Sequence, residues 1–123
     1  MRWRSYEVNI MPVGNKGYDL ECVSPGRIPF VVEAKCSTSK GTQAPVQLDH
    51  LQGVSRADRF YVFVKHIDGA LEEFVVMTNE EVQAAWVLME KRMSTGEPYI
   101  INGGYLDWVH LTPHRERWDK LPK

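Results

Sequence analysis

The sequence predicts an α/β domain, bordering on α+β, with a mixed central β-sheet flanked by helices. Polar and apolar residues alternate in several short stretches of the first third of the chain, as they do in half-buried strands. The apolar run within Asp58 to Ile67 is typical of a strand buried on both faces. A capped amphipathic helix then begins near Thr78. Strands and helices in this order indicate a mixed sheet, and residues 1–123 are predicted to form a single domain.

The composition is that of an ordinary globular protein, with 43% hydrophobic and 25% charged residues. The net charge of −1 gives no bulk signal for nucleic acid, although a local basic stripe would suffice to bind it. No apolar run approaches the roughly 20 residues of a membrane span, and no signal peptide precedes the first strand. These features predict a cytoplasmic protein without a membrane partner. Cys22 and Cys36 are then expected to be buried free thiols, too far apart for a disulfide.

The first three strands are predicted at Tyr6–Met11, Gly17–Ser24 and Val31–Cys36. The first ends at a loop that contains Pro12 and Gly14. Ser24-Pro25-Gly26-Arg27 is a strong turn signal, so the second and third strands are expected to form a β-hairpin.

The register of this hairpin follows from its turn, because opposed residues of an antiparallel pair share a face. A turn centred on Gly26 pairs Asp19 with Glu33, Leu20 with Val32, and Cys22 with Phe30. One face is then apolar, with Tyr18, Leu20, Cys22, Phe30, Val32, Ala34 and Cys36. The other face collects Asp19, Glu21, Glu33 and Lys35. Opposed carboxylates repel each other, whereas two carboxylates and an ammonium suit a hard cation and an activated water. The hairpin is therefore the predicted functional site.

A polar loop over Ser37–Gln43 and a helix over Val46–Ser55 are predicted to follow the hairpin. The buried strand at Asp58–Ile67 then turns at His66–Gly69 into another strand at Leu71–Met77.

Thr78 and Glu81 have the spacing of a capping box, and the helix that they begin is expected to end near Met93. Its buried stripe is Val82, Ala85, Trp86, Met89 and Met93. Short strands are predicted at 99–102 and 105–111. The basic tail, residues 112–123, is expected to be a solvated extension held by Trp108 and Trp118, although His110 and His114 could also follow a phosphate backbone.

Asp19 followed by Glu33-Ala34-Lys35 on a hydrophobic strand resembles the PD-(D/E)XK nuclease superfamily, especially nuclease-type domains of bacterial defence and repair proteins. The resemblance covers residues 6–67 and implies the restriction-endonuclease-like fold. It implies that Asp19, Glu33 and the Ala34 carbonyl bind Mg²⁺, or Mn²⁺ as a substitute, and that Lys35 activates water. The implied activity is that of a metal-dependent DNA endonuclease. The chain departs from the family at Tyr18, where proline is common. Members also usually carry a helix in the place where this chain has only Met1–Ser5.

Three further residues are candidates for an outer ligand or a phosphate contact: Glu21, Gln47 and Lys40. A surface charge on the strand explains Glu21 equally well, and for Gln47 a solvated helix start is the favoured interpretation. Two other functions stay open, namely a catalytically silent nuclease-like module that binds DNA or a partner protein, and a small interaction domain. A homodimer or a larger multidomain partner is compatible with all of them.

Overall fold

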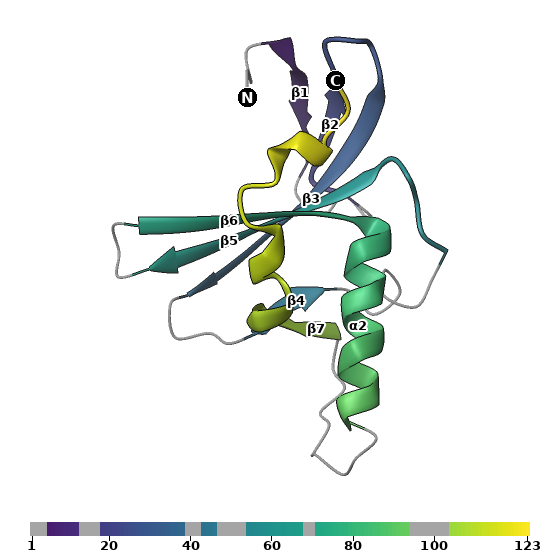
Figure 1. Ribbon diagram of the computed structural model, residues 1–123. Helices are drawn as coiled ribbons and strands as arrows, with labels where there is room; N and C mark the ends of the chain where they lie inside the picture. The colour runs from purple at the N-terminus through teal and green to yellow at the C-terminus, as the bar shows by residue number, and fades with distance from the viewer. Residues whose placement is uncertain (1–4, 13–17, 39–42, 47–53, 68–70, 94–103) are drawn as a thin grey trace.

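A five-stranded mixed sheet organises the protein (Figure 1). The computed structural model describes residues 5–12, 18–38, 43–46, 54–67, 71–93 and 104–123. The sheet has the order β1-β2-β3-β5-β6. Its strands are β1 (Glu7–Ile10), β2 (Leu20–Val23), β3 (Pro29–Thr38), β5 (Arg59–Ile67) and β6 (Leu71–Thr78).

The strand directions confirm a mixed sheet. β1, β2 and β3 pair antiparallel, β3 and β5 pair parallel, and β5 and β6 pair antiparallel. A parallel pair needs a crossover, because the chain must return to the same end of the sheet. The crossover from β3 to β5 contains β4 (Gln43–Val46), which pairs antiparallel with β7 (Gly104–Asp107) as a separate two-stranded sheet. With one described helix, this is a domain of the α/β type.

The helix expected over Val46–Ser55 is contradicted at its two ends and untested between them. Val46 was expected to begin a helix, but it is a buried strand residue opposite Gly104. Val54 and Ser55, at the other end of the expected helix, are not helical, and residues 47–53 lie outside the described residues. The predicted polar loop is also shorter than expected, since β3 extends to Thr38 and β4 begins at Gln43. Pairing with a strand some sixty residues away determines this structure, and local periodicity carries no information about such a partner.

The predicted capped helix is confirmed as α2 (Asn79–Met93). The Glu81 N–H donates to the Thr78 hydroxyl at 3.1 Å, and the Thr78 N–H donates to the Glu81 carboxylate at 2.9 Å. These reciprocal bonds satisfy two backbone donors at the start of the helix. Val82, Ala85 and Trp86 of the predicted stripe are buried. The side chains of Met89 and Met93 lie outside the described part of the structure.

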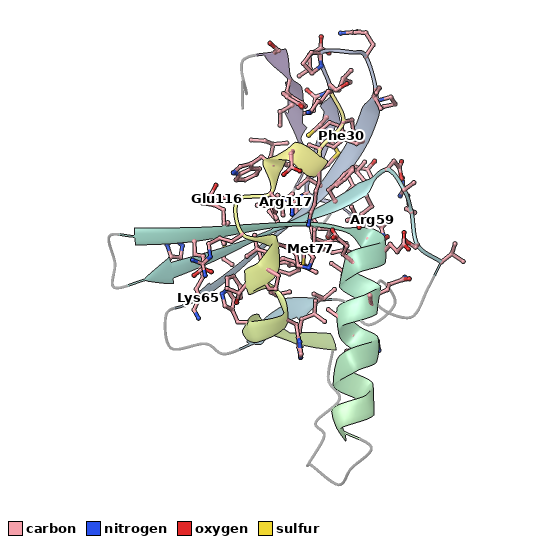
Figure 2. The ribbon with its side chains drawn as sticks, in the orientation of Figure 1. Phe30, Arg59, Lys65, Met77, Glu116 and Arg117 are labelled. Carbon is pink, nitrogen blue, oxygen red and sulfur yellow. The ribbon has the colours of Figure 1, made fainter. Side chains whose placement is uncertain are left out.

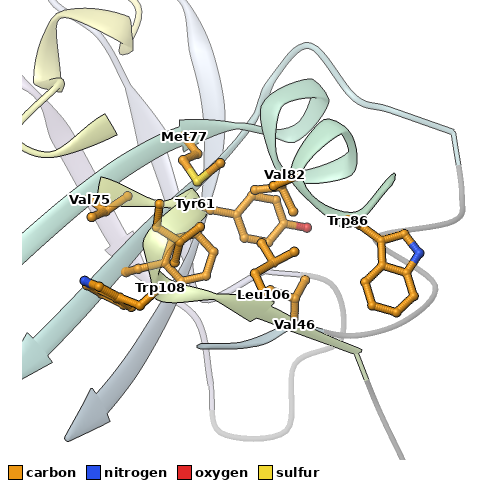
Figure 3. Close-up of a cluster of buried hydrophobic side chains, with 11 residues drawn as sticks. Val46, Tyr61, Val75, Met77, Val82, Trp86, Leu106 and Trp108 are labelled. Carbon is orange, nitrogen blue, oxygen red and sulfur yellow. The ribbon is translucent and has the colours of Figure 1, made fainter. Parts of the chain in front are cut away.

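The two faces of the sheet carry separate cores. α2, β4 and β7 cover one face, where Tyr61, Val82 and Leu106 are buried (Figure 3). On the same face Tyr61 and Phe63 of β5 stack with ring centroids 6.0 Å apart. The opposite face holds Cys22, Phe30, Val32, Phe60, Val76 and Leu121. Consecutive residues of β5 enter different cores because side chains alternate across a strand. This confirms that β5 is a strand buried on both faces.

The C-terminal segment is packed, and is not the solvated tail that was expected. β7 ends at Asp107, and 3₁₀ turns follow at η2 (Trp108–His110), η3 (Thr112–His114) and η4 (Trp118–Lys120). The segment crosses β6 towards the β1–β2 end of the sheet, with Glu116 and Arg117 between η3 and η4 (Figures 1 and 2). The Glu116 N–H donates to the carbonyl of Phe74 in β6, and Leu121 is buried. Its apolar residues therefore pack onto the sheet while its arginines stay exposed. The strand expected at 99–102 lies outside the described residues.

Candidate metal and phosphate site

The β2–β3 hairpin has the predicted register. Leu20 pairs with Val32 and Cys22 with Phe30, as a turn centred on Gly26 requires. The Ser24 hydroxyl accepts the Ile28 N–H at 3.0 Å. Arg27 adopts a φ of 65°, a left-handed conformation that the tight turn imposes. The turn therefore fixes which residues of the two strands meet.

The ladder changes at Asp19. With the register of Leu20 and Val32, Asp19 was expected opposite Glu33, but its N–H donates to the Val32 carbonyl at 2.9 Å. Asp19 and Leu20 therefore both face Val32, which is the arrangement of a β-bulge. A bulge re-aims side chains and interrupts the alternation of the strand.

Tyr18 lies on the face of the hairpin opposite to the one predicted from strict alternation. This residue was assigned to the apolar face of the hairpin, but it lines a polar cleft together with Glu21 and Val31 on the other face. The extra residue at the bulge reverses the face on which side chains before it lie. The rest of the predicted apolar face is largely confirmed, since Leu20, Cys22, Phe30, Val32 and Ala34 line one apolar cavity.

The Asp19 carboxylate is held against β3. Its Oδ2 accepts the backbone N–H of Ala34 at 2.8 Å, while its carbonyl accepts the Met11 N–H at 2.9 Å. Because β2 pairs with β3 only from Leu20 onward, this carboxylate supplies the acceptor that a further strand residue would provide. Asp19 is thus brought beside the peptide that separates Glu33 from Lys35.

Glu33 and Lys35 lie on the face of β3 opposite that of Val32. In the parallel ladder Glu33 is beside Tyr61 and Lys35 is beside Phe63. Glu33 is only 4% exposed, whereas Lys35 is half-buried and Asp19 is exposed. The Glu33 side chain is therefore largely shielded from solvent, in contrast to Asp19.

A polar cleft of about 170 Å³ lies along β2 and β3; its lining includes Tyr18, the neighbour of Asp19 in sequence, but none of Asp19, Glu33, Ala34 and Lys35. Its polar lining contains a bidentate ion pair in which Arg56 donates to Asp58 at 2.9 and 2.8 Å. Hydrogen bonding from Arg56 holds the pKa of Asp58 below its ordinary value. Glu7, also in the lining, pairs with Arg27 at 2.8 Å. The complete lining is Glu7, Asn9, Tyr18, Glu21, Cys22, Val23, Pro29, Phe30, Val31, Arg56 and Asp58.

Of the three residues predicted as outer ligands or phosphate contacts, only Glu21 is among the described residues. Glu21 is exposed and lines the cleft, which is compatible with the predicted role and does not test it. Gln47 and Lys40 lie outside the described residues, so their predicted roles stay predictions.

The oxygen atoms of Asp19, Glu33 and the Ala34 carbonyl are of the type that binds a hard cation. Ala34 directs its N–H and carbonyl to the same edge of β3, so its carbonyl lies on the side where Asp19 is held. Two carboxylates and a carbonyl supply the oxygen ligands that Mg²⁺ prefers, and a Mg²⁺ site of this kind usually keeps several waters. Within the described ranges, no three or more His, Cys, Asp or Glu side chains gather as a cation site. A cation here would therefore depend on the backbone oxygen and water.

Sequence reasoning missed a second polar cluster. The Lys120 Nζ lies 2.6 Å from the His114 Nδ1 and 2.9 Å from Glu81, and it donates to the Val76 carbonyl at 3.1 Å. His114 lies 3.3 Å from the same Glu81 carboxylate. The capping box identified Glu81, but nothing in the sequence brings the C-terminal segment to it. His114 is engaged here with protein groups, in contrast to the phosphate contact considered for it.

The thiols differ from each other. Both cysteines are free, as expected, but only Cys22 is buried and Cys36 is exposed. The C-terminal residues Trp118 and Leu121 pack near Cys22, whereas Cys36 lies towards the other end of β3. The expectation that both are buried is wrong for Cys36.

The sequence matches no protein-family model, and a search of curated proteins found no match. Among the described helices, none is long and apolar enough to cross a membrane.

Proposed function

We propose that this α/β domain is a metal-dependent DNA endonuclease of the restriction-endonuclease-like kind. The observation that carries the proposal is the 2.8 Å hydrogen bond from the Ala34 N–H to the Asp19 carboxylate. It holds the Asp19 carboxylate against the backbone of Ala34, the residue between Glu33 and Lys35, and these four are the residues that the family resemblance selects. Hydrolysis of a phosphodiester needs charge neutralisation and a positioned water, and these residues can supply both.

Each residue has a distinct role in this proposal. Asp19, Glu33 and the Ala34 carbonyl would hold Mg²⁺, or Mn²⁺ in its place. The metal would lower the pKa of a bound water and neutralise charge on the phosphate. The Lys35 ammonium would donate hydrogen bonds to the water or to a phosphate oxygen, and thereby orient them. The hydrogen bond from Ala34 keeps Asp19 in place before any ligand arrives, which reduces the cost of ordering the site.

The polar cleft supports a substrate path beside these residues. Its carboxylates Glu7 and Asp58 are paired with arginines, which limits their repulsion of a phosphate backbone. Among the described residues Glu21 is the cleft carboxylate without an ion pair at 4 Å or less. A metal ion near Asp19 would offset its charge.

The burial of Glu33 favours one alternative. A carboxylate that is 4% exposed can also serve a purely structural role within the sheet. The second candidate is therefore a silent nuclease-like module that binds DNA or a partner protein without cleaving DNA. For this silent module we expect that removing the charge at Asp19 does not weaken the binding of DNA or of the partner protein.

The decisive experiment is cleavage of supercoiled plasmid with Mg²⁺ or Mn²⁺ by the wild type and three nearly isosteric variants, Asp19→Asn, Glu33→Gln and Lys35→Met. Each variant should reduce metal-dependent nicking by at least about a hundredfold. Glu80→Gln and Lys123→Met are matched controls, because both residues are exposed and neither belongs to the proposed site: Glu80 lies in α2, and Lys123 lies beside Gly26 at the turn of the hairpin. The controls should cleave like the wild type.

Cleavage that survives all three substitutions would overturn the proposal. Absence of cleavage by the wild type would also count against it and would favour the silent module. Isothermal titration with Mn²⁺ separates metal binding from catalysis, since only the nuclease site predicts a metal affinity that Asp19→Asn lowers.

A further inference from the structure

The outer edge of β1 offers an interaction surface that the nuclease proposal does not use. β1 ends the five-stranded sheet, and all four of its residues are exposed. Two of them are large and apolar, with Val8 46% and Ile10 81% exposed. An edge strand presents backbone donors and acceptors that can pair with another strand, and apolar residues there strengthen such pairing.

The hydrogen-bond pattern of β1 determines which residues face outward. In the β1–β2 ladder Asn9 pairs with Glu21, and the next bond in that series joins the Met11 N–H to the Asp19 carbonyl at 2.9 Å. Alternate residues of an antiparallel strand bond to opposite sides. The backbone groups of Val8 and Ile10 are therefore directed away from β2, towards the edge of the sheet.

We propose that β1 pairs antiparallel with β1 of a second copy of this chain, about a two-fold axis at Val8. In this register the backbone N–H and carbonyl of Val8 form hydrogen bonds with those of Val8 of the partner subunit. The backbone groups of Tyr6 pair in the same way with those of Ile10 of the partner subunit. A two-fold contact is self-complementary, because the same surface serves both copies. The inference stands independently of the nuclease proposal.

Hydrogen bonding between side chains and the avoidance of like charges favour this register. It places Glu7 opposite Asn9 of the partner subunit, whose amide can donate to the carboxylate. Shifting the axis to Glu7 would oppose two glutamates, which is destabilising. Shifting it to Asn9 would place Tyr6 opposite Pro12 of the partner subunit, and proline has no N–H to donate.

The apolar face of the sheet supports the same pairing. A cavity of about 160 Å³ on this face is lined in part by Tyr6, Val8 and Leu20. Opposed residues share a face, so the side chain of Ile10 from the partner subunit would lie beside Tyr6 at the rim of this cavity. The pairing thus covers the two most exposed apolar side chains of β1 in both copies. A contact this short lies at the small end of specific interfaces, so we expect dissociation constants in the micromolar range.

Sedimentation equilibrium of the full chain from micromolar to millimolar concentration tests the pairing. The wild type should show a monomer–dimer equilibrium, and Val8→Lys and Ile10→Lys should each weaken it at least tenfold. Ile28→Lys and Val54→Lys are matched controls, since these residues are 47% and 92% exposed but lie off the edge. A wild type that stays monomeric at millimolar concentration, or controls that dissociate equally, would overturn the proposal.

Disulfide trapping supplies a test that does not depend on loss of association. In a Cys22→Ala, Cys36→Ser background, which also removes the thiol opposite Val8 in the β1–β2 ladder, Val8→Cys should form a covalent dimer under mild oxidation, because directly opposed Cα atoms lie about 5.5 Å apart. Asn9→Cys should not, because it faces Glu7 of the partner subunit in this register. Trapping at Asn9 in preference to Val8 would overturn the pairing about Val8. Circular dichroism of each variant checks that the fold is retained.

Discussion

The ammonium of Lys120 lies 2.9 Å from the carboxylate of Glu81, and this contact ties the C-terminal segment to the first turn of α2. The Lys120 side chain is 11% exposed, so little water competes for its ammonium. Glu81 also accepts the Thr78 N–H in the capping box. One carboxylate therefore serves both the helix start and the tail.

Replacing Lys120 with methionine should lower the free energy of unfolding by about 1–2 kcal/mol. The substitution keeps most of the packed stem but leaves the Glu81 carboxylate and the Val76 carbonyl without this donor. Urea denaturation followed by tryptophan fluorescence measures the change. Lys123→Met, at an exposed position, should alter stability by less than about 0.5 kcal/mol. An equal loss in both variants would contradict a specific role for the Lys120–Glu81 contact.

The same cluster predicts that stability falls as the solution is acidified. Burial lowers the pKa of His114 below its ordinary value of about 6.5, and the positive charge of Lys120 lowers it further. Glu81 opposes this shift and Arg117 adds to it. Since the unfolded chain then binds more protons than the folded chain, the free energy of unfolding decreases as the pH falls below about 6.5.

Urea titrations at several pH values between 7.5 and 5 test this dependence. His114→Gln should flatten the profile over that range, because glutamine does not titrate. The pKa of Glu81 is also lowered: burial opposes this shift, but bonding from Thr78 and Lys120 outweighs it. Its effect should appear only at more acidic pH. An unchanged slope in His114→Gln would assign the pH dependence to another group.

Local signals in the sequence were sufficient for the hairpin and for the helix start. Alternation together with the turn at Gly26 predicted the pairing of Leu20 with Val32, and the spacing of Thr78 and Glu81 predicted the capping box. Both structures are determined by residues close together in the chain. Side-chain alternation and capping geometry therefore carry the information directly.

The errors involve partners that are distant in sequence or a break in alternation. β4 forms because Val46 meets Gly104, and Lys120 reaches Glu81 only after the tail has folded onto β6. The bulge at Asp19 adds one residue to the strand. The residue types around Asp19 do not predict this bulge. That bulge also determines where the Asp19 carboxylate lies, so the details of the candidate site follow from tertiary structure.

The two thiols should react at very different rates. Cys36 is exposed, whereas burial shields Cys22 and raises the pKa of its thiol. The thiolate is the reactive form, so Cys22 should alkylate at least about a hundredfold more slowly at pH 8. Mass spectrometry after timed iodoacetamide treatment should show one rapid modification, and Cys36→Ser should remove it. Rapid modification that persists in Cys36→Ser would show that Cys22 is accessible.

The hydrogen bond between Asp19 and Ala34 should be detectable as protection of one amide. Asp19→Ala removes the acceptor, so the Ala34 N–H should exchange with solvent at least about tenfold faster than in the wild type. Asp19→Asn retains a side-chain oxygen that can accept the same bond, and it should preserve most of the protection while removing the charge. Hydrogen exchange followed by NMR measures both variants, with the Val31 N–H, which donates to the Asp58 carbonyl at 2.8 Å, as an internal reference. Equal exchange of the Ala34 amide in wild type and Asp19→Ala would mean that the carboxylate is not held against β3. In that case the candidate site would have to be assembled by the metal itself.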